Sequence, residues 1–161
     1  MDTEAMLNAI RDYLDDNDWN YEYDAEHSLI KMGLGMKCKL HTVRIFIDLK
    51  ADYYLVYVVA PINADKDNLG ELLRYTARAN YGLINGNFEL DVRDGEFRYK
   101  SYVNCDGLET LPPAIIEESI HVGCAMMNRY GNGFAALAMG FSDADTEIDK
   151  VENKDGQDES E

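Results

Sequence analysis

The segment that spans residues 78–99 constrains the fold of this chain more than any other stretch. Apolar side chains alternate with charged ones from Phe88 to Val92 and again from Phe97 to Tyr99, which is the period-two pattern of strands with one buried face. The pair Asp94-Gly95 lies between the two runs, and both residues tolerate the positive φ angles of a type I′ turn. The segment therefore predicts a helix that ends near Tyr81, followed by a two-stranded hairpin with a two-residue turn.

Length and charge limit the kinds of partner. The chain has 161 residues, enough for one domain with a real core, and 31 acidic against 15 basic residues give it a net charge of −16. An acidic surface repels phosphate backbones and anionic lipid, so the charge argues against binding to nucleic acid or to a membrane surface. No run of 18 apolar residues occurs, and residues 1–16 lack the cationic and apolar regions of a secretory signal. The expected location is therefore the cytoplasm.

Two Cys–His pairs in the sequence are candidate metal ligands. Cys38 and His41 have the spacing of half a zinc site, as do His121 and Cys124, and together the four side chains would supply four ligands. Cys124, however, falls in the apolar stripe of a predicted helix, where a cysteine usually acts as a small hydrophobe. With Cys105 the cysteines are odd in number and form no CxxC pair, so reduced, buried thiols are expected. We predict no metal and no cofactor.

Periodicity predicts three helices and five strands. The expected helices span residues 3–16, 66–81 and the segment that Pro112-Pro113 opens, and the expected strands span residues 28–36, 42–50 and 53–60 and the two arms of the hairpin. The order is α-β-β-β-α-β-β-α, which is typical of an α+β fold with a five-stranded antiparallel sheet. One-sided alternation in the strands places the first and third helices on one face of that sheet.

The last twenty residues differ in composition from the rest. Residues 143–161 contain nine acidic residues against Lys150 and Lys154, and few apolar ones. Such a segment buries too little apolar surface to offset the entropy of ordering it. We therefore expect one domain over residues 1–141 and a disordered acidic tail over residues 142–161 that is dispensable for folding.

No motif predicts catalysis. No serine or cysteine has the sequence context of a nucleophile, and residues 65–70, which look like the opening of a calcium-binding EF-hand loop, are followed by Thr76 where a bidentate glutamate is required. Helix capping by Asp65 accounts for that segment better.

The order of elements and the residues around the hairpin resemble the bacterial YbjN family. The resemblance covers roughly residues 3–140 and is sharpest over residues 80–98, where the signature residues are Asn80, Tyr81, Gly82, Asn87, Phe88, Asp94 and Gly95. These residues serve a helix end and a turn. The family shares the α+β fold of class I type III secretion chaperones, and its members are described as sensory transduction regulators. The resemblance implies a non-enzymatic protein with no catalytic residues to transfer, and the chaperone fold suggests binding of protein segments.

We therefore expect a cytoplasmic interaction module that binds a peptide or partner protein in a chaperone-like, regulatory manner. One alternative is a small-ligand-binding protein or enzyme with a pocket between sheet and helices. Another is a purely structural homodimer. A deep pocket with converging polar groups would favour the first alternative, and a flat apolar patch would favour binding of a protein or dimerisation.

The expected partner surface lies on the sheet face away from the helices. It would consist of Phe46, Tyr54, Val56, Val58 and Tyr102, with Arg44, Asp48, Arg93, Arg98 and Lys100 as a charged rim. This assignment takes the register of the third strand to follow that of its neighbour. A slip of one residue would put Tyr53, Leu55 and Tyr57 there instead. The alternative is that this face is covered by the predicted helix over residues 66–81 or by a dimer mate.

Overall fold

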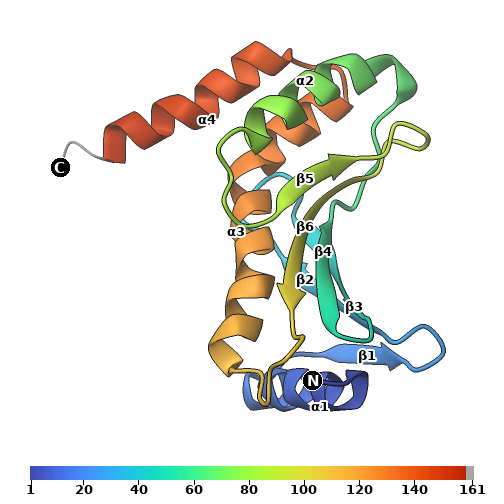
Figure 1. Cartoon of the computed structure of the whole chain (residues 1–161). Coiled ribbons are helices and arrows are strands. Elements are labelled where there is room, and N and C mark those ends of the chain that lie inside the picture. Colours follow the sequence, from blue (N-terminus) through green and yellow to red (C-terminus); the bar gives the residue numbers. More distant parts are fainter. Residues whose placement is uncertain (159–161) are drawn as a thin grey trace.

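The computed structural model describes the backbone of residues 1–158 and the side chains of residues 1–153. Its helices are α1 (Thr3–Asp16), α2 (Leu69–Asn80), α3 (Pro113–Ala138) and α4 (Ala144–Asp158), and a 3-10 turn, η1 (Lys66–Asn68), precedes α2 (Figure 1). Its strands are β1 (Tyr21–Asp24), β2 (Leu29–Gly35), β3 (Thr42–Leu49), β4 (Tyr53–Val59), β5 (Asn87–Leu90) and β6 (Phe97–Asn104). This is an α+β fold, as the sequence predicts.

The strands form one antiparallel sheet in the order β1-β2-β3-β4-β6-β5. The prediction of five strands is wrong, because β1 is a sixth strand that pairs with the first half of β2. Four residues are too few for a period-two pattern to stand out, and Asp24 ends this one with a turn in which its carboxylate accepts hydrogen bonds from His27 and Lys31.

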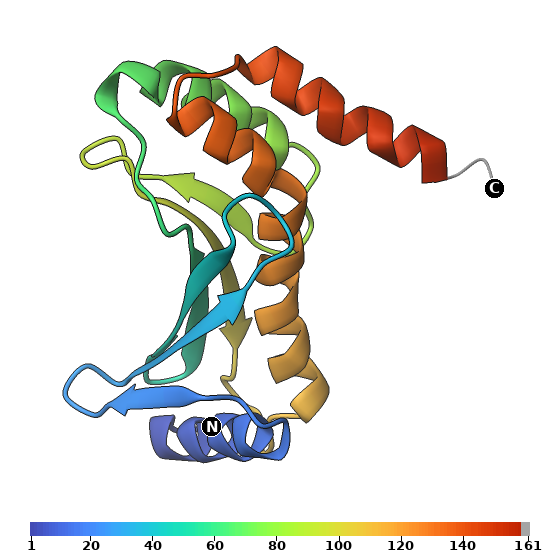
Figure 2. The same ribbon diagram turned by 180° about the vertical axis from the view of Figure 1, so that it is seen from behind.

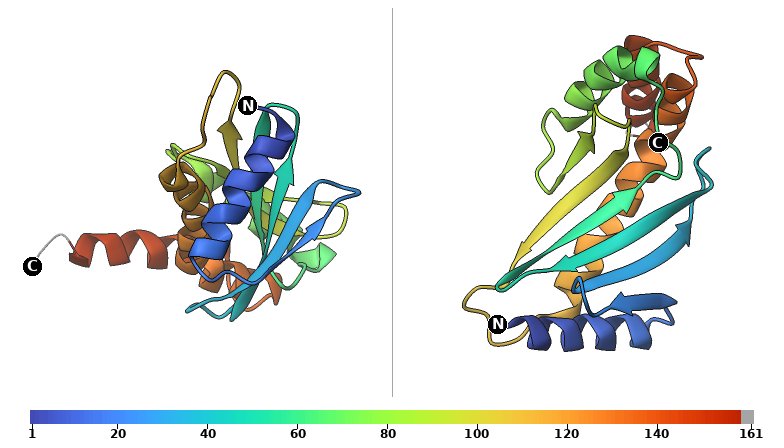
Figure 3. Two further views of the ribbon diagram at one scale, coloured as in Figure 1. Left: turned by 90° about the horizontal axis from the view of Figure 1, so that it is seen from below. Right: turned by 90° about the vertical axis from the view of Figure 1, so that its right-hand side faces the viewer.

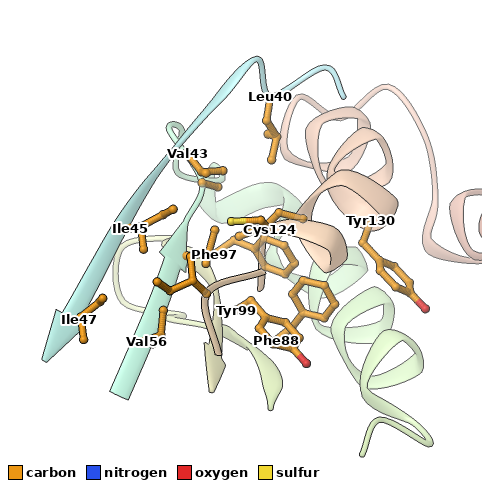
Figure 4. Packing of buried hydrophobic residues seen from close by; sticks show 14 of the residues in the cluster. Leu40, Val43, Ile45, Ile47, Val56, Phe88, Phe97, Tyr99, Cys124 and Tyr130 are labelled. Atoms are coloured by element: carbon orange, nitrogen blue, oxygen red, sulfur yellow. The ribbon is translucent and has the colours of Figure 1, made fainter. Parts of the chain in front are cut away.

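Helices cover one face of the sheet. Helix α3 crosses β4 and β6, and α1 packs on β3 and on α3. The view in Figure 3 (right) shows the other face with no helix over it. The core lies between α3 and the sheet, where Phe97 stacks on Phe134 at 4.3 Å and on Phe88 at 5.1 Å between ring centroids. Figure 4 shows side chains of β3, β4 and β6 on the side of the sheet where Cys124 of α3 lies.

Glycines on α3 allow close packing. A Cβ on Gly123 would lie 2.5 Å from a methyl of Val58, and one on Gly131 would lie 2.7 Å from the sulfur of Cys38. A Cβ on Gly133 would overlap the hydroxyl of Tyr75. Glycine lowers helix propensity, yet α3 continues through Gly131 and Gly133 to Ala138, and neighbouring side chains pack against both positions.

The hairpin exists, but its turn differs from the prediction. Pairing ends at Leu90 and Phe97, so the loop spans residues 91–96, and among its residues only Gly95 has a positive φ, at 78°. The N–H of Gly95 donates to the carbonyl of Asp91 at 2.7 Å, which makes a longer loop than a type I′ turn. The Asp-Gly pair predicts the position of the hairpin correctly. It does not predict the length of the loop, which depends on where the pairing between the two strands ends.

The acidic C-terminal segment is helical where disorder was expected. Helix α4 packs on α2 and α3 and buries Ala144, Glu147, Ile148 and Val151. Arg74 and Arg78 of α2 pair with Asp145 and Glu152 at 2.8 and 2.7 Å. Apolar residues three and four apart therefore give this segment one buried stripe despite its composition. Residues 159–161 of the expected tail lie outside the described residues.

Replacement of Gly95 by valine should lower the melting temperature strongly. A β-branched residue at positive φ costs about 1–2 kcal/mol, and a Cβ at this position would also overlap the carbonyl of Ala64. Gly82→Val is the matched control, because Gly82 has a φ of 86° and open space around it. Thermal melting followed by circular dichroism should show the larger loss for Gly95→Val, and equal losses would contradict the close contact with Ala64.

Removal of α4 should destabilise the chain. A chain that ends at Phe141 loses the buried Ile148 and Val151 and exposes the surfaces of α2 and α3 beneath them. The point variant Ile148→Ala should cost about 2 kcal/mol. The exposed neighbour Asp149 provides the control Asp149→Ala, which should stay within about 0.5 kcal/mol of the parent in urea unfolding. An unchanged midpoint in the truncated chain would show that α4 contributes nothing to stability.

Candidate functional site

The open face of the sheet carries a row of aromatic and apolar side chains. Phe46 lies opposite Tyr57, and Leu55 lies opposite Tyr102. Tyr53 completes the set, with its ring 5.2 Å from that of Tyr102. We call these five residues the aromatic face. Cross-strand partners point to the same side of a sheet, so all five point away from α3.

Two of the expected partner-surface residues lie on this face and three do not. Phe46 and Tyr102 point outward, and the Tyr102 side chain is 55% exposed. The placement of Tyr54, Val56 and Val58 on the same side is wrong. Val56 pairs with Ile47 and Val58 with Ile45, and all three misplaced residues are buried in the core.

The link between β3 and β4 decides this register. Lys50 donates its N–H to the carbonyl of Tyr53 at 2.9 Å, so residues 51 and 52 form a two-residue loop. In such a hairpin the residues that flank the loop pair directly, which puts Tyr54 opposite Leu49 on the core face. Tyr53, Leu55 and Tyr57 therefore belong to the open face, as in the one-residue slip. The short link was the signal that could have found them.

Several charged side chains on the open face form ion pairs with one another. Glu89 of β5 receives hydrogen bonds from Arg98, at 2.8 Å, and from Lys100. Burial opposes ionisation of Glu89, but these two hydrogen bonds outweigh it and hold its pKa below the usual value. The guanidinium of Arg98 also lies 4.3 Å from the ring centre of Tyr57. Arg44, Asp48, Arg98 and Lys100 are on the open face as expected, whereas Arg93 lies in the loop and pairs with Asp91.

The signature residues at the start of the hairpin serve the edge of the sheet. The side-chain amide of Asn80 accepts a hydrogen bond from the N–H of Phe88 at 2.7 Å and donates one to its carbonyl at 3.0 Å. Asn80 thus occupies backbone groups that a further strand would use. Tyr81 follows the end of α2 with its side chain exposed, Gly82 has a positive φ, and Asn87 also donates to the Phe88 carbonyl.

The cysteines and histidines do not form a metal centre. Among the side chains of residues 1–153, no group of three or more His, Cys, Asp or Glu is placed to hold a metal ion. Cys38, Cys105 and Cys124 are unpaired and buried, and burial raises the pKa of Cys124 to about 11. His121 lies on the exposed side of α3 near Trp19 and Glu117.

The space between α3 and the sheet is filled by the core. The buried cluster takes in the inward side chains of β3, β4 and β6 and the stripe of α3 that faces them. A hydroxyl pair within it, Tyr54 and Ser119, is bonded internally at 3.1 Å. A hollow of about 210 Å³ lies between β6 and α3, with Ser101, Glu118 and Ser119 in its lining. Its volume is below the range that is typical of ligand sites. The aromatic face is what remains as a surface for binding on the sheet.

None of the described helices is long and apolar enough to cross a membrane.

Three comparisons relate the chain to known proteins. The YbjN family, described as "Putative bacterial sensory transduction regulator", matches residues 7–136. The crystal structure of YbjN from E. coli, titled a putative transcription regulator, has a TM-score of 0.59 at 13% identity and covers 83% of this chain and 92% of that chain. The HopA1-SchA chaperone-effector complex contains a chain with a TM-score of 0.53 at 10% identity, which covers 81% of this chain and 95% of that one. No curated protein matches the sequence.

A negative charge at two neighbouring residues of β4 should destabilise the chain to very different extents. Val56→Asp places an unpaired carboxylate in the core, so the free energy of unfolding should fall by more than about 4 kcal/mol. Leu55→Asp places the same group on the open face and should cost about 1 kcal/mol. Urea unfolding of both variants tests the register. A folded Val56→Asp together with an unfolded Leu55→Asp would reverse the assignment of the two faces.

Proposed function

Because this chain belongs to the YbjN family, we propose that it is a non-enzymatic protein-interaction module that holds a segment of a partner protein against the aromatic face. The observation that carries the proposal is that this face has no helix over it and yet presents Phe46, Tyr57 and Tyr102 outward. Large apolar patches are rare on monomers and mark interaction sites.

The chemistry of the face suits a protein segment. Aromatic side chains inside a rim of charge are the usual composition of an interface, because rigid rings supply contact area at small entropic cost. The ion pairs of Glu89 keep the charges of Arg98 and Lys100 satisfied before a partner arrives. Binding over this part of the face therefore requires little desolvation of unpaired charge.

The similarity to a chain of a chaperone-effector complex supports the same class of function. Neither the family description nor the titles of the similar structures names an enzymatic reaction. Within this proposal the module acts in the cytoplasm, a location that its three unpaired cysteines favour. A second copy of the chain is the other occupant that the aromatic face could take, which would make the module a homodimer.

Substitution of Tyr57 by aspartate should remove partner binding without unfolding the chain. The immobilised parent and Tyr57→Asp are compared for the proteins that each retains from a lysate of the native cell, identified by mass spectrometry. Val92→Asp is the control, because Val92 is 51% exposed in the β5–β6 loop and lies outside the aromatic face. Proteins retained by the parent and by Val92→Asp, and lost by Tyr57→Asp, support the proposal. The same set on all three would overturn it. Sizing chromatography of the purified chains identifies the homodimer.

A further inference from the structure

We propose that a groove between α3, α4 and the β2–β3 loop is a second binding site, and that its ligand is a short acidic segment of a partner protein that also carries apolar side chains. The groove is lined by Lys39, Arg129, Asn132, Ala136, Lys150 and Val151 and has a volume of about 410 Å³. An adjoining hollow of about 390 Å³ shares Lys39, Ala136 and Lys150 and extends to Met139 and Phe141. Volumes of this size are typical of ligand sites.

The loop that carries the cations is fixed on α3. The side-chain oxygens of Asn128 and Asn132, one turn apart, accept hydrogen bonds from the N–H groups of Lys37 at 3.0 Å and Lys39 at 2.8 Å. The sulfur of Cys38 donates to the carbonyl of Met127, and Cys38 fits against Gly131. Figure 2 shows this loop against the middle of α3. The backbone of the two lysines is therefore held in position before any ligand binds, so the loop itself need not be ordered on binding.

The loop lysines carry unpaired positive charge on a chain of net charge −16. Most other cations of the described residues have an acidic partner within 4 Å: Lys31, Lys50, Arg74, Arg78, Arg93, Arg98, Lys100 and Lys150. Lys37 and Lys39 have none there. Among the described residues of the lining, the carboxylate of Glu147 is buried and bonded to Lys150 at 2.6 Å. A ligand carboxylate can therefore pair with Lys39 without breaking an existing ion pair.

The far end of the groove is apolar. Met139 and Phe141 are 59% and 81% exposed, and Ala135 and Ala136 line the surface of α3 beside them. This end supplies hydrophobic contact that a bare anion cannot use. The net negative charge of the chain disfavours long polyanions such as nucleic acid, whose charge extends beyond the groove. A short peptide with both acidic and apolar side chains matches both ends.

The groove differs from the aromatic face in position and in chemistry, so the inference does not rest on the function proposed above. The groove lies on the helical side of the molecule, and the aromatic face lies on the opposite side of the sheet. A variant of either surface can therefore be tested while the other stays intact.

The test is fluorescence anisotropy with the full chain and a short labelled peptide of alternating aspartate and leucine. The parent should bind the peptide, and binding should weaken as salt is raised because Lys39 contributes by charge. Lys39→Glu should weaken binding by about tenfold or more. Ala136→Trp, which fills the groove without a change of charge, should weaken it as well. Lys66→Glu is the matched control, because Lys66 is an exposed cation of η1 outside the groove, and it should bind like the parent.

Two further peptides and one further variant complete the design. Peptides of alternating aspartate and serine, or of alternating lysine and leucine, should bind at least about tenfold more weakly than the first. Leu55→Asp on the aromatic face should bind it like the parent. The inference is overturned if the parent does not bind the first peptide, if Lys39→Glu binds it equally well, if the serine peptide binds as tightly, or if Leu55→Asp rather than Lys39→Glu loses binding. Circular dichroism confirms that each variant is folded.

Discussion

Helix α3 meets the sheet, the β2–β3 loop and helix α2 at three glycines, and each contact is too close for a side chain. Gly123 faces Val58 of β4, Gly131 faces Cys38 and Leu40, and Gly133 faces Tyr75. Protein interiors are packed as densely as organic crystals, so three separate elements are positioned by one helix surface. This packing buries the inner face of the sheet. The aromatic face is on the other side, which none of the described helices covers.

The same contacts position the groove. Cys38 and Leu40 point inward because Gly131 makes room for them, and Lys39, the residue between them, is exposed. Tyr75 reaches over Gly133 and donates its hydroxyl hydrogen to the carbonyl of Tyr130 at 2.8 Å. This bond fixes α2 on α3, and α4 packs on the pair. Both candidate surfaces are thus consequences of how tightly α3 is packed.

Much of this architecture is readable from the sequence, and the errors have separate physical causes. One-sided alternation in β3 identifies Val43, Ile45 and Ile47 as core, and the structure confirms it. The face of β4 could not be read from β4 itself, because that strand is apolar on both sides. The two-residue link at Ala51-Asp52 sets the register of β4 on β3 and so decides which face of β4 is buried. The pattern of hydrophobicity does not carry this information.

Two further misses, the helical C-terminal segment and strand β1, concern the partner against which a segment packs. The composition of residues 142–161 predicts disorder, but Ile148 and Val151 are buried in helix α4, which packs on α2 and α3. The sequence of the segment does not show that such a surface exists. Strand β1 has four residues and depends on β2 for its definition. In both cases the partner of the segment, rather than the segment, decides whether it is ordered.

The hydrogen bonds at the β5 edge of the sheet affect how a partner can bind. At β5, Asn80 already occupies the N–H and carbonyl of Phe88, so addition of a strand there would have to displace two hydrogen bonds. Contact through side chains on the aromatic face displaces none. Glu89, Arg98 and Lys100 on that face are paired with one another, whereas Lys37 and Lys39 have no acidic partner among the described residues. Apolar contact on the aromatic face would therefore supply affinity but distinguish poorly between partners. The two lysines would distinguish partners by charge, because a positively charged segment beside them would be repelled.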